Sequence, residues 1–240
     1  MADYQTSVAR GGVRADIDVG LRAYMNKVYM LMAVAMLVTG VVAFYVGNNA
    51  YLLQTFFTGA MRWVVMFAPL IFVFAFAAMI HKMSTATANI AFYAFSAVMG
   101  LSIAWIFAVF TLGSIAQTFF ATSVAFLGLS LYGYTTKSDL SGWGRFLIMG
   151  VIGLIVVSIA NIFIGSDALS MAISALGVLI FAGLTAYDTQ RIKQEYLEMS
   201  AAGPEGEAYL EKGAIMGALS LYINFINMFM FLLQFMGSQE

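Results

Sequence analysis

The sequence predicts an all-α integral membrane protein, a bundle of seven transmembrane helices. Of its 240 residues, 62% are hydrophobic and 10% are charged, whereas an ordinary soluble domain carries about 25% charged residues. The apolar residues gather in long segments, and a helix needs about 20 apolar residues to cross a hydrocarbon core of about 30 Å. Short connectors with turn-forming residues separate these segments. The length of the chain is therefore best counted in membrane spans.

Composition also excludes several kinds of function. The net charge is −1 and no basic stripe is present, so we do not expect nucleic acid as a partner. The chain has no cysteine, which excludes disulfides, thiolate ligands and a cysteine nucleophile. The partner that the composition does require is the lipid bilayer.

Seven apolar segments are expected to cross the membrane. They are, in order along the chain, Val28–Val46, Trp63–Ile80, Ile90–Phe110, Ile115–Tyr134, Phe146–Ile164, Leu169–Asp188 and Ala214–Met236. The first is too long for the core of a removable signal peptide, which is about 7–15 residues. The predicted organisation is a cytosolic N-terminal arm over residues 1–27, a transmembrane domain over residues 28–236 and a short tail over residues 237–240.

Two segments outside the spans have a predicted structure of their own. In the arm, Ile17, Leu21, Tyr24 and Val28 fall at helical spacing behind two aspartates. Such a stripe favours an amphipathic helix that lies on the inner membrane surface. The connector 194–212 is polar and acidic, and we expect it to be mobile.

The distribution of lysine and arginine predicts how the bundle lies in the membrane, because cytoplasmic connectors carry an excess of these residues. All but one of the 11 lie on the arm and on the second, fourth and sixth connectors: Arg10, Arg14, Arg22, Lys27, Lys82, Lys137, Arg145, Arg191, Lys193 and Lys212. Only Arg62 lies on the opposite side. We therefore predict that the N-terminus is cytosolic, and an odd number of spans then places the C-terminus outside.

Asp188 stands out among the acids because it belongs to a predicted span rather than to a connector. A charge at a helix centre costs about 2.5–3.5 kcal/mol on insertion scales, so ionisable groups in spans usually face the bundle and mark a pathway or a switch. Nothing in the sequence breaks the helix between Asp188 and Tyr196, which places the carboxyl about two turns inside the helix end. Two interpretations follow: a buried titratable group, or a solvated carboxylate at the membrane interface.

The last span carries one stripe of small and polar residues at helical spacing. The stripe consists of Gly213, Gly217, Ser220, Asn224 and Asn227. Its two glycines form a GxxxG pattern, which permits the close approach of another helix. Because the sixth and seventh spans run antiparallel, we expect Asn224 at contact depth with Asp188. The alternative is that the stripe only joins neighbouring helices by hydrogen bonds.

Three motifs together resemble those of the Bax inhibitor-1 family, the transmembrane BAX inhibitor motif proteins. They are "LYGYTTKSDLSGWG" at 131–144, "GLTAYDTQRIK" at 183–193 and "GALSLYINFINMF" at 217–229. The resemblance extends over residues 20–237 and points to the bacterial branch. It implies seven spans with a cytosolic N-terminus in a bacterial inner membrane.

The resemblance further implies a pH-sensitive calcium leak channel. In the family, an acid in the motif matched here by "YDTQ" and an acid in the last span share a proton and gate the pore. The first position is Asp188; the second is Asn224, an asparagine where the family usually has aspartate. A basic residue at the inner end of the second span also engages the first acid, and Lys82 is its nearest match. The implied site is thus Asp188, Asn224 and Lys82 for pH sensing and gating, with Ser220 and Asn227 as polar pore residues and Asp188 and Asn224 as calcium ligands.

The asparagine at position 224 changes the expected chemistry. Two adjacent carboxylates titrate as a unit, whereas Asp188 opposite an amide has no such neighbour. The amide can donate a hydrogen bond to the ionised acid, while burial favours the neutral acid. One carboxylate and one amide oxygen also hold calcium less strongly than two carboxylates. The sequence leaves open whether family-type pH gating is shifted, weakened or lost.

Two other classes of function were weighed against the ion pathway. A regulatory membrane protein that binds other membrane proteins, such as a membrane-bound protease, also fits the resemblance. An enzyme is not expected, because an intramembrane aspartyl protease needs a second aspartate within the spans. A zinc protease needs a motif such as HExxH, and the chain has one histidine. No cofactor is expected, and calcium enters only as a permeant ion.

Overall fold

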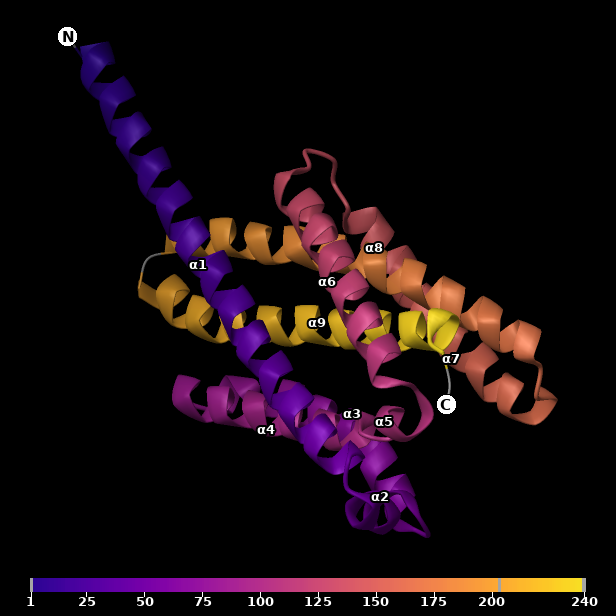
Figure 1. Ribbon diagram of the computed structural model, residues 1–240. Coiled ribbons are helices and arrows are strands. Elements are labelled where there is room, and N and C mark those ends of the chain that lie inside the picture. Colours follow the sequence, from indigo (N-terminus) through magenta and orange to yellow (C-terminus); the bar gives the residue numbers. More distant parts are fainter. Residues whose placement is uncertain (1, 203, 239–240) are drawn as a thin grey trace.

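The computed structural model describes the backbone of residues 2–202 and 204–238, with side chains described from residue 19 onward except at 81, 204, 205, 207 and 208. Over these ranges the chain is helical and contains no strand (Figure 1). The elements are α1 (Ala2–Gly47), α2 (Ala50–Phe57), α3 (Met61–Met79), η1 (Ile80–Lys82), α4 (Thr85–Ile103), α5 (Ile106–Val109), α6 (Leu112–Thr135), α7 (Ser141–Ile164), α8 (Asp167–Met199), η2 (Ser200–Ala202) and α9 (Pro204–Met236).

Seven stretches of the described chain are long and apolar enough to cross a membrane. They are Val19–Gly47, Met61–Met79, Thr85–Val109, Leu112–Thr135, Ser141–Ile164, Asp167–Ala202 and Tyr209–Met236. Each contains most of one predicted span, so the prediction of an all-α, seven-span bundle is confirmed. The observed helices are mostly longer than the predicted spans because their polar ends stay helical beyond the apolar segment.

Capping residues explain where several helices begin and end. The side chain of Asn49 accepts hydrogen bonds from backbone N–H groups at the start of α2, and Ser84, Thr111 and Ser166 do the same for α4, α6 and α8. Such side chains satisfy donors that have no partner within the helix. Gly165 ends α7 in the left-handed conformation, with φ of 68°, which glycine adopts without steric cost.

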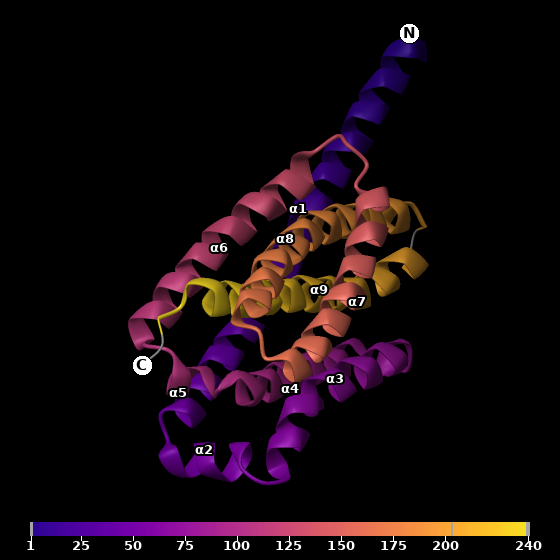
Figure 2. The ribbon, with the colours of Figure 1, turned by 90° about the vertical axis from the view of Figure 1, so that its right-hand side faces the viewer.

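Helix α9 lies at the centre of the bundle, between α8 and α4 (Figures 1 and 2). In its most apolar stretch 61% of the residues are buried, against 11% in the corresponding stretch of α7 at the periphery. Leu221, Tyr222 and Ala218 of α9 are fully buried. The polar stripe predicted on this span is therefore enclosed by protein on most sides.

The N-terminal arm does not form a separate helix on the membrane surface. Helix α1 runs without a break through the arm and the first span. Leu21, Tyr24 and Val28 are buried in the bundle, and the Tyr24 ring packs on that of Tyr196, with ring centroids 5.1 Å apart. The apolar stripe faces protein because α8 extends far enough to cover it; the side chain of Ile17 lies outside the described residues.

The connector 194–212, which was expected to be mobile, is largely helical. Helix α8 continues to Met199 and is followed by η2, and α9 begins at Pro204. Alanine, glutamate, leucine and methionine are frequent in this segment, and all four have high helix propensity. At its far end, the Thr85 hydroxyl donates to the Glu211 carboxylate at 2.9 Å.

The spans alternate in direction, so their connectors gather at two ends of the bundle. The start of α9 meets the start of α4 at one end. At the other end, the backbone N–H of Ser238 donates to the Ser114 hydroxyl at 2.9 Å. We call the first of these the basic end, because the connectors there carry Lys82, Lys137, Arg145 and Lys212.

Candidate functional site: a carboxylate between the last two helices

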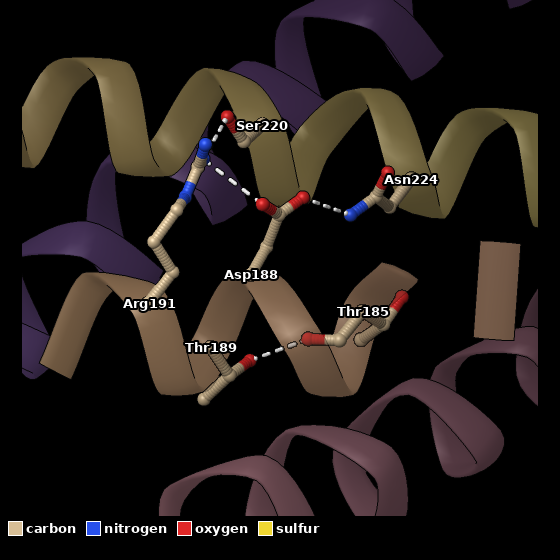
Figure 3. A network of polar contacts seen from close by, with 6 residues as sticks. All are labelled: Thr185, Asp188, Thr189, Arg191, Ser220 and Asn224. Atoms are coloured by element: carbon tan, nitrogen blue, oxygen red, sulfur yellow. Dashed lines mark hydrogen bonds and ion pairs between the residues drawn. The ribbon is translucent and has the colours of Figure 1, made fainter. Parts of the chain in front are cut away.

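Asp188 lies inside the bundle, on the side of α8 that faces α9 (Figure 3). Only 8% of the residue is exposed. Because α8 continues to Met199, the carboxyl lies about three turns from the helix end, deeper than the two turns predicted. Of the two interpretations, the structure has the buried group rather than the solvated one.

Each oxygen of this carboxylate has its own partner. The Asn224 amide nitrogen Nδ2 donates to Asp188 Oδ2 at 2.7 Å. The Arg191 nitrogen Nη2 is 2.9 Å from Asp188 Oδ1 and also donates to the Ser220 hydroxyl at 3.1 Å. The four side chains form one chain of polar contacts that joins α8 to α9 twice (Figure 3), which we call the polar bridge. Hydrogen bonds that involve an ionised partner are shorter and stronger than neutral ones.

Small residues on α9 explain how the two backbones come close enough for these short side chains to meet. Gly217 is buried two turns from Asn224, and a Cβ atom there would lie 3.1 Å from the Ile192 side chain of α8. Ala218 beside it is fully buried. The GxxxG pattern therefore has the predicted effect of permitting close helix contact.

The opposite side of α8 is tied to α6. Thr189 lies next to Asp188 in the sequence but points away from it, toward α6 (Figure 3); its hydroxyl approaches that of Ser130 at 3.4 Å. A Cβ atom at Gly133 of α6 would lie only 2.9 Å from the backbone carbonyl carbon of Ala186. Helix α8 is therefore in close contact on both sides, with polar side chains on each.

Two further residues of α8 fix the loop between α6 and α7. The Gln190 amide donates to the backbone oxygen of Ser138 and accepts from the backbone N–H of Leu140, each at 2.8 Å. Lys193 donates to the backbone oxygen of Tyr134 at 2.8 Å, which satisfies a carbonyl at the end of α6. Besides the acid, the motif "YDTQRIK" thus supplies Gln190 and Lys193, whose hydrogen bonds hold α8 to the end of α6 and to the loop that follows it.

A cleft of about 550 Å³ lies beside the polar bridge. It is lined by residues of α3, η1, α8 and α9, and its charged lining residues are Arg191, Glu195, Glu198 and Lys212. The Arg191 side chain is 47% exposed, whereas the Asp188 side chain is 11% exposed. The guanidinium group therefore separates the carboxylate from the cleft.

Aromatic side chains pack on the far side of the polar bridge. The Phe225 ring, next to Asn224, lies with its centroid 5.5 Å from those of Phe119 and Phe126. Tyr222 is fully buried among rings of α4 and donates to or accepts from the Thr39 hydroxyl. The polar bridge thus lies between a cleft with charged lining residues and a region of apolar side chains.

The structure brings together some of the predicted site residues and not others. The expected contact of Asp188 with Asn224 is confirmed, and Ser220 joins them through Arg191. Asn227 instead donates to the Ile223 oxygen of its own helix at 2.8 Å. Lys82 is an exposed residue of η1, and the cation bonded to Asp188 is Arg191.

The role of Arg191 was missed in the sequence, although a signal for it exists. Residues three apart on a helix are neighbours, so an acid and a base at i and i+3 are a pair to consider. The positive charge of Arg191 was used only to orient the bundle.

Oxygen ligands for a metal are few: the described residues contain no group of three or more His, Cys, Asp or Glu that could hold an ion.

This fold and this site define a multi-pass helical membrane protein with a buried carboxylate between its last two spans. The sequence model of the family described as inhibitor of apoptosis-promoting Bax1 matches residues 21–240. The chain therefore belongs to the Bax inhibitor-1 family, as its three motifs indicated.

Relatives of similar length support the same assignment. The inner membrane protein YbhL of Escherichia coli strain K12 is 41% identical over 222 residues, which cover 92% of this chain and 94% of the relative. A protein of Caulobacter vibrioides is 42% identical over 253 residues, and the alignment covers 100% of both chains. A membrane protein of Streptococcus pyogenes serotype M1 is 32% identical over 233 residues, 93% of this chain and 96% of the relative. With its seven apolar helices, the chain is a multi-pass inner membrane protein.

Proposed function

We propose that this protein is a pH-sensitive leak pathway for calcium or another cation, and that the polar bridge is its gate. The observation that carries the proposal is the buried Asp188 carboxylate, separated from a charged cleft by one half-exposed guanidinium group. An ionisable group inside a membrane bundle usually marks a pathway or a switch. The proposal takes the basic end as cytosolic, so that the cleft opens to the cytosol.

In the described state the gate is closed. An ionised Asp188 holds Arg191 by charge and Asn224 by a hydrogen bond, and the attraction between charges is strong where water is scarce. The guanidinium at the base of the cleft repels an approaching cation, and the aromatic rings beyond Asn224 offer a cation no oxygen ligand.

Protonation of Asp188 would release this arrangement. A neutral carboxyl no longer attracts Arg191, whose side chain can then turn into the cleft toward Glu195 and Glu198, which line it together with Lys212. Binding of the proton and closure of the gate oppose each other, so cation flux is expected to rise as the pH falls. Calcium takes 6–8 oxygen ligands, so Asp188 and Asn224 would supply only part of its shell during passage.

The proposal treats the chain as a non-enzymatic protein without a cofactor. A carboxylate with both oxygens engaged by neighbours suits a structural switch better than acid–base chemistry on a substrate, which needs a partner within hydrogen-bond reach of the reacting atom.

Calcium flux into liposomes that contain the purified protein tests the proposal, measured from about pH 5 to about pH 8. We expect flux from the unchanged chain to rise as the pH falls. Asp188→Asn, which resembles the protonated acid, should give high flux at every pH. Asp167→Asn is the matched control, because it removes an acid from the first turn of the same helix and should behave like the unchanged chain.

Two results would count against the pathway. One is the absence of flux at every pH, with Asp188→Asn indistinguishable from the unchanged chain. The other is a stoichiometric membrane-protein partner that co-purifies with both chains in the absence of flux, which would favour the regulatory alternative.

A further inference from the structure

A long groove lies between α1 and α6, with α9 as its floor. Figure 1 shows α1 and α6 in front of α9, diverging toward the end where the N-terminus lies. The groove has a volume of about 930 Å³ and an almost wholly apolar lining that includes Met32, Met36, Leu37, Phe119, Leu127 and Phe225. Because both flanking helices are membrane spans, the groove is at the depth of lipid chains.

The basic end of this groove carries polar side chains as well as apolar ones. A second hollow of about 520 Å³ shares Tyr29 and Leu127 with the groove and continues it toward the basic end. Its lining includes the charged side chain of Arg22 and the amide of Asn26, both from α1, together with Ser130 of α6. The Tyr29 hydroxyl lies near the side chains of Ser130 and Thr189. The lining therefore gains hydrogen-bonding side chains from Tyr29 toward the basic end.

The two parts of the groove are long enough for the headgroup and one acyl chain of a phospholipid. From Arg22 to Tyr29 the helix rises about 10 Å, and from Tyr29 to Tyr45, the last residue of α1 in the lining, about 24 Å, at 1.5 Å per residue. Half of a hydrocarbon core of about 30 Å is about 15 Å. The apolar part therefore spans the depth of one leaflet and continues beyond it.

We propose that this groove binds one anionic phospholipid of the leaflet at the basic end. The phosphate would lie against Arg22 and Asn26, and one acyl chain would follow α1 past Gly40. An arginine suits this position because its guanidinium binds phosphate oxygens in pairs. A phospholipid fits better than a protein helix because the groove becomes apolar at the depth where the bilayer does.

Native mass spectrometry of the full chain, purified in detergent with phosphatidylglycerol or phosphatidylcholine of the same acyl chains, tests the headgroup site. We expect the unchanged chain to retain phosphatidylglycerol preferentially. Arg22→Gln should lower this preference about fivefold, the effect of one basic residue near a lipid phosphate. Lys27→Gln is the matched control: Lys27 is exposed on the same helix and lines neither hollow. An equal loss in both variants would reflect general surface charge and overturn the proposal.

A second pair of variants tests the acyl groove. A Cβ atom at Gly40 has no neighbour within 4 Å, and Gly40 lines the groove, so Gly40→Leu should fill it without a clash. Gly128→Leu on α6 is equally free of neighbours but does not line the groove. We expect Gly40→Leu to lose both lipids and Gly128→Leu to keep them. Retained lipid in Gly40→Leu would overturn the proposal, as would a lipid-free dimer that Gly40→Leu dissociates, because the groove would then be a protein interface.

Discussion

At the scale of single residues, the charge of Asp188 is matched on both of its oxygens. The guanidinium of Arg191 compensates the charge, and the amide of Asn224 fills the remaining hydrogen-bonding position. A buried carboxylate that loses one such partner is left uncompensated, which is costly. Asn224, where the resemblance implied an aspartate, therefore supplies a hydrogen bond that the buried carboxylate needs.

The change Asn224→Asp should strengthen the pH response of calcium flux. Two carboxylates at the 2.7 Å separation of the present contact cannot both ionise easily, so one proton would be shared and the pair would titrate as a unit. Flux in liposomes across the pH range should then change more steeply than in the unchanged chain.

Asn227→Asp is the control for this change. It adds an acid one turn further along α9, where the present amide is bonded to its own helix. A pH profile of Asn224→Asp that coincides with those of Asn227→Asp and of the unchanged chain would show that the contact with Asp188 does not set the response.

At the scale of helices, the site depends on how closely α8 is held between α6 and α9. Gly217 permits the contact on one side and Gly133 on the other. The neighbour at Gly133 is the backbone of α8, at Ala186, which cannot turn aside as a side chain can. The position of the Asp188 carboxyl is thus set by backbone contacts as well as by its polar partners.

Gly133→Ala should destabilise the protein. The added Cβ atom would overlap the Ala186 backbone, and such overpacking costs about 1–3 kcal/mol. Gly128→Ala on the same helix meets no atom within 4 Å and should be neutral or stabilising, because alanine favours a helix. Thermal unfolding in detergent compares the two; equal midpoints would show that α6 and α8 adjust freely at this contact.

At the scale of the whole molecule, the distribution of positive charge predicts one orientation in the membrane. The fold places the basic connectors together at one end, as that prediction requires. The excess of lysine and arginine on the cytoplasmic side then sets the direction. The cleft beside Arg191 and the hollow lined by Arg22 and Asn26 open at this same end.

Labelling of single cysteines measures the orientation directly, because the chain has no cysteine of its own. We expect Asn48→Cys, between α1 and α2, to react with a membrane-impermeant maleimide on intact cells. Lys137→Cys, between α6 and α7, should react only after the membrane is opened. The reverse labelling pattern would show that the predicted orientation is wrong and that the cleft faces the outer side.

Much of the fold could be predicted from the sequence because membrane spans are a local property. Each of the seven runs is apolar enough to require lipid, and the length of a run is enough to identify a helix. The same reasoning was wrong for Leu21 and Tyr24, because an apolar stripe alone does not show whether lipid or protein covers it.

For the candidate site, the sequence by itself determined that one acid lies on a span and that Asn224 is at the same depth on the next helix. Only the tertiary structure decided that Arg191, rather than Lys82, bonds to Asp188, and that Asn227 turns back to its own backbone. These outcomes depend on the rotation of each helix about its axis and on how far α8 extends. Spacing along one helix fixes which residues share a face, but the packing of several helices fixes what that face meets.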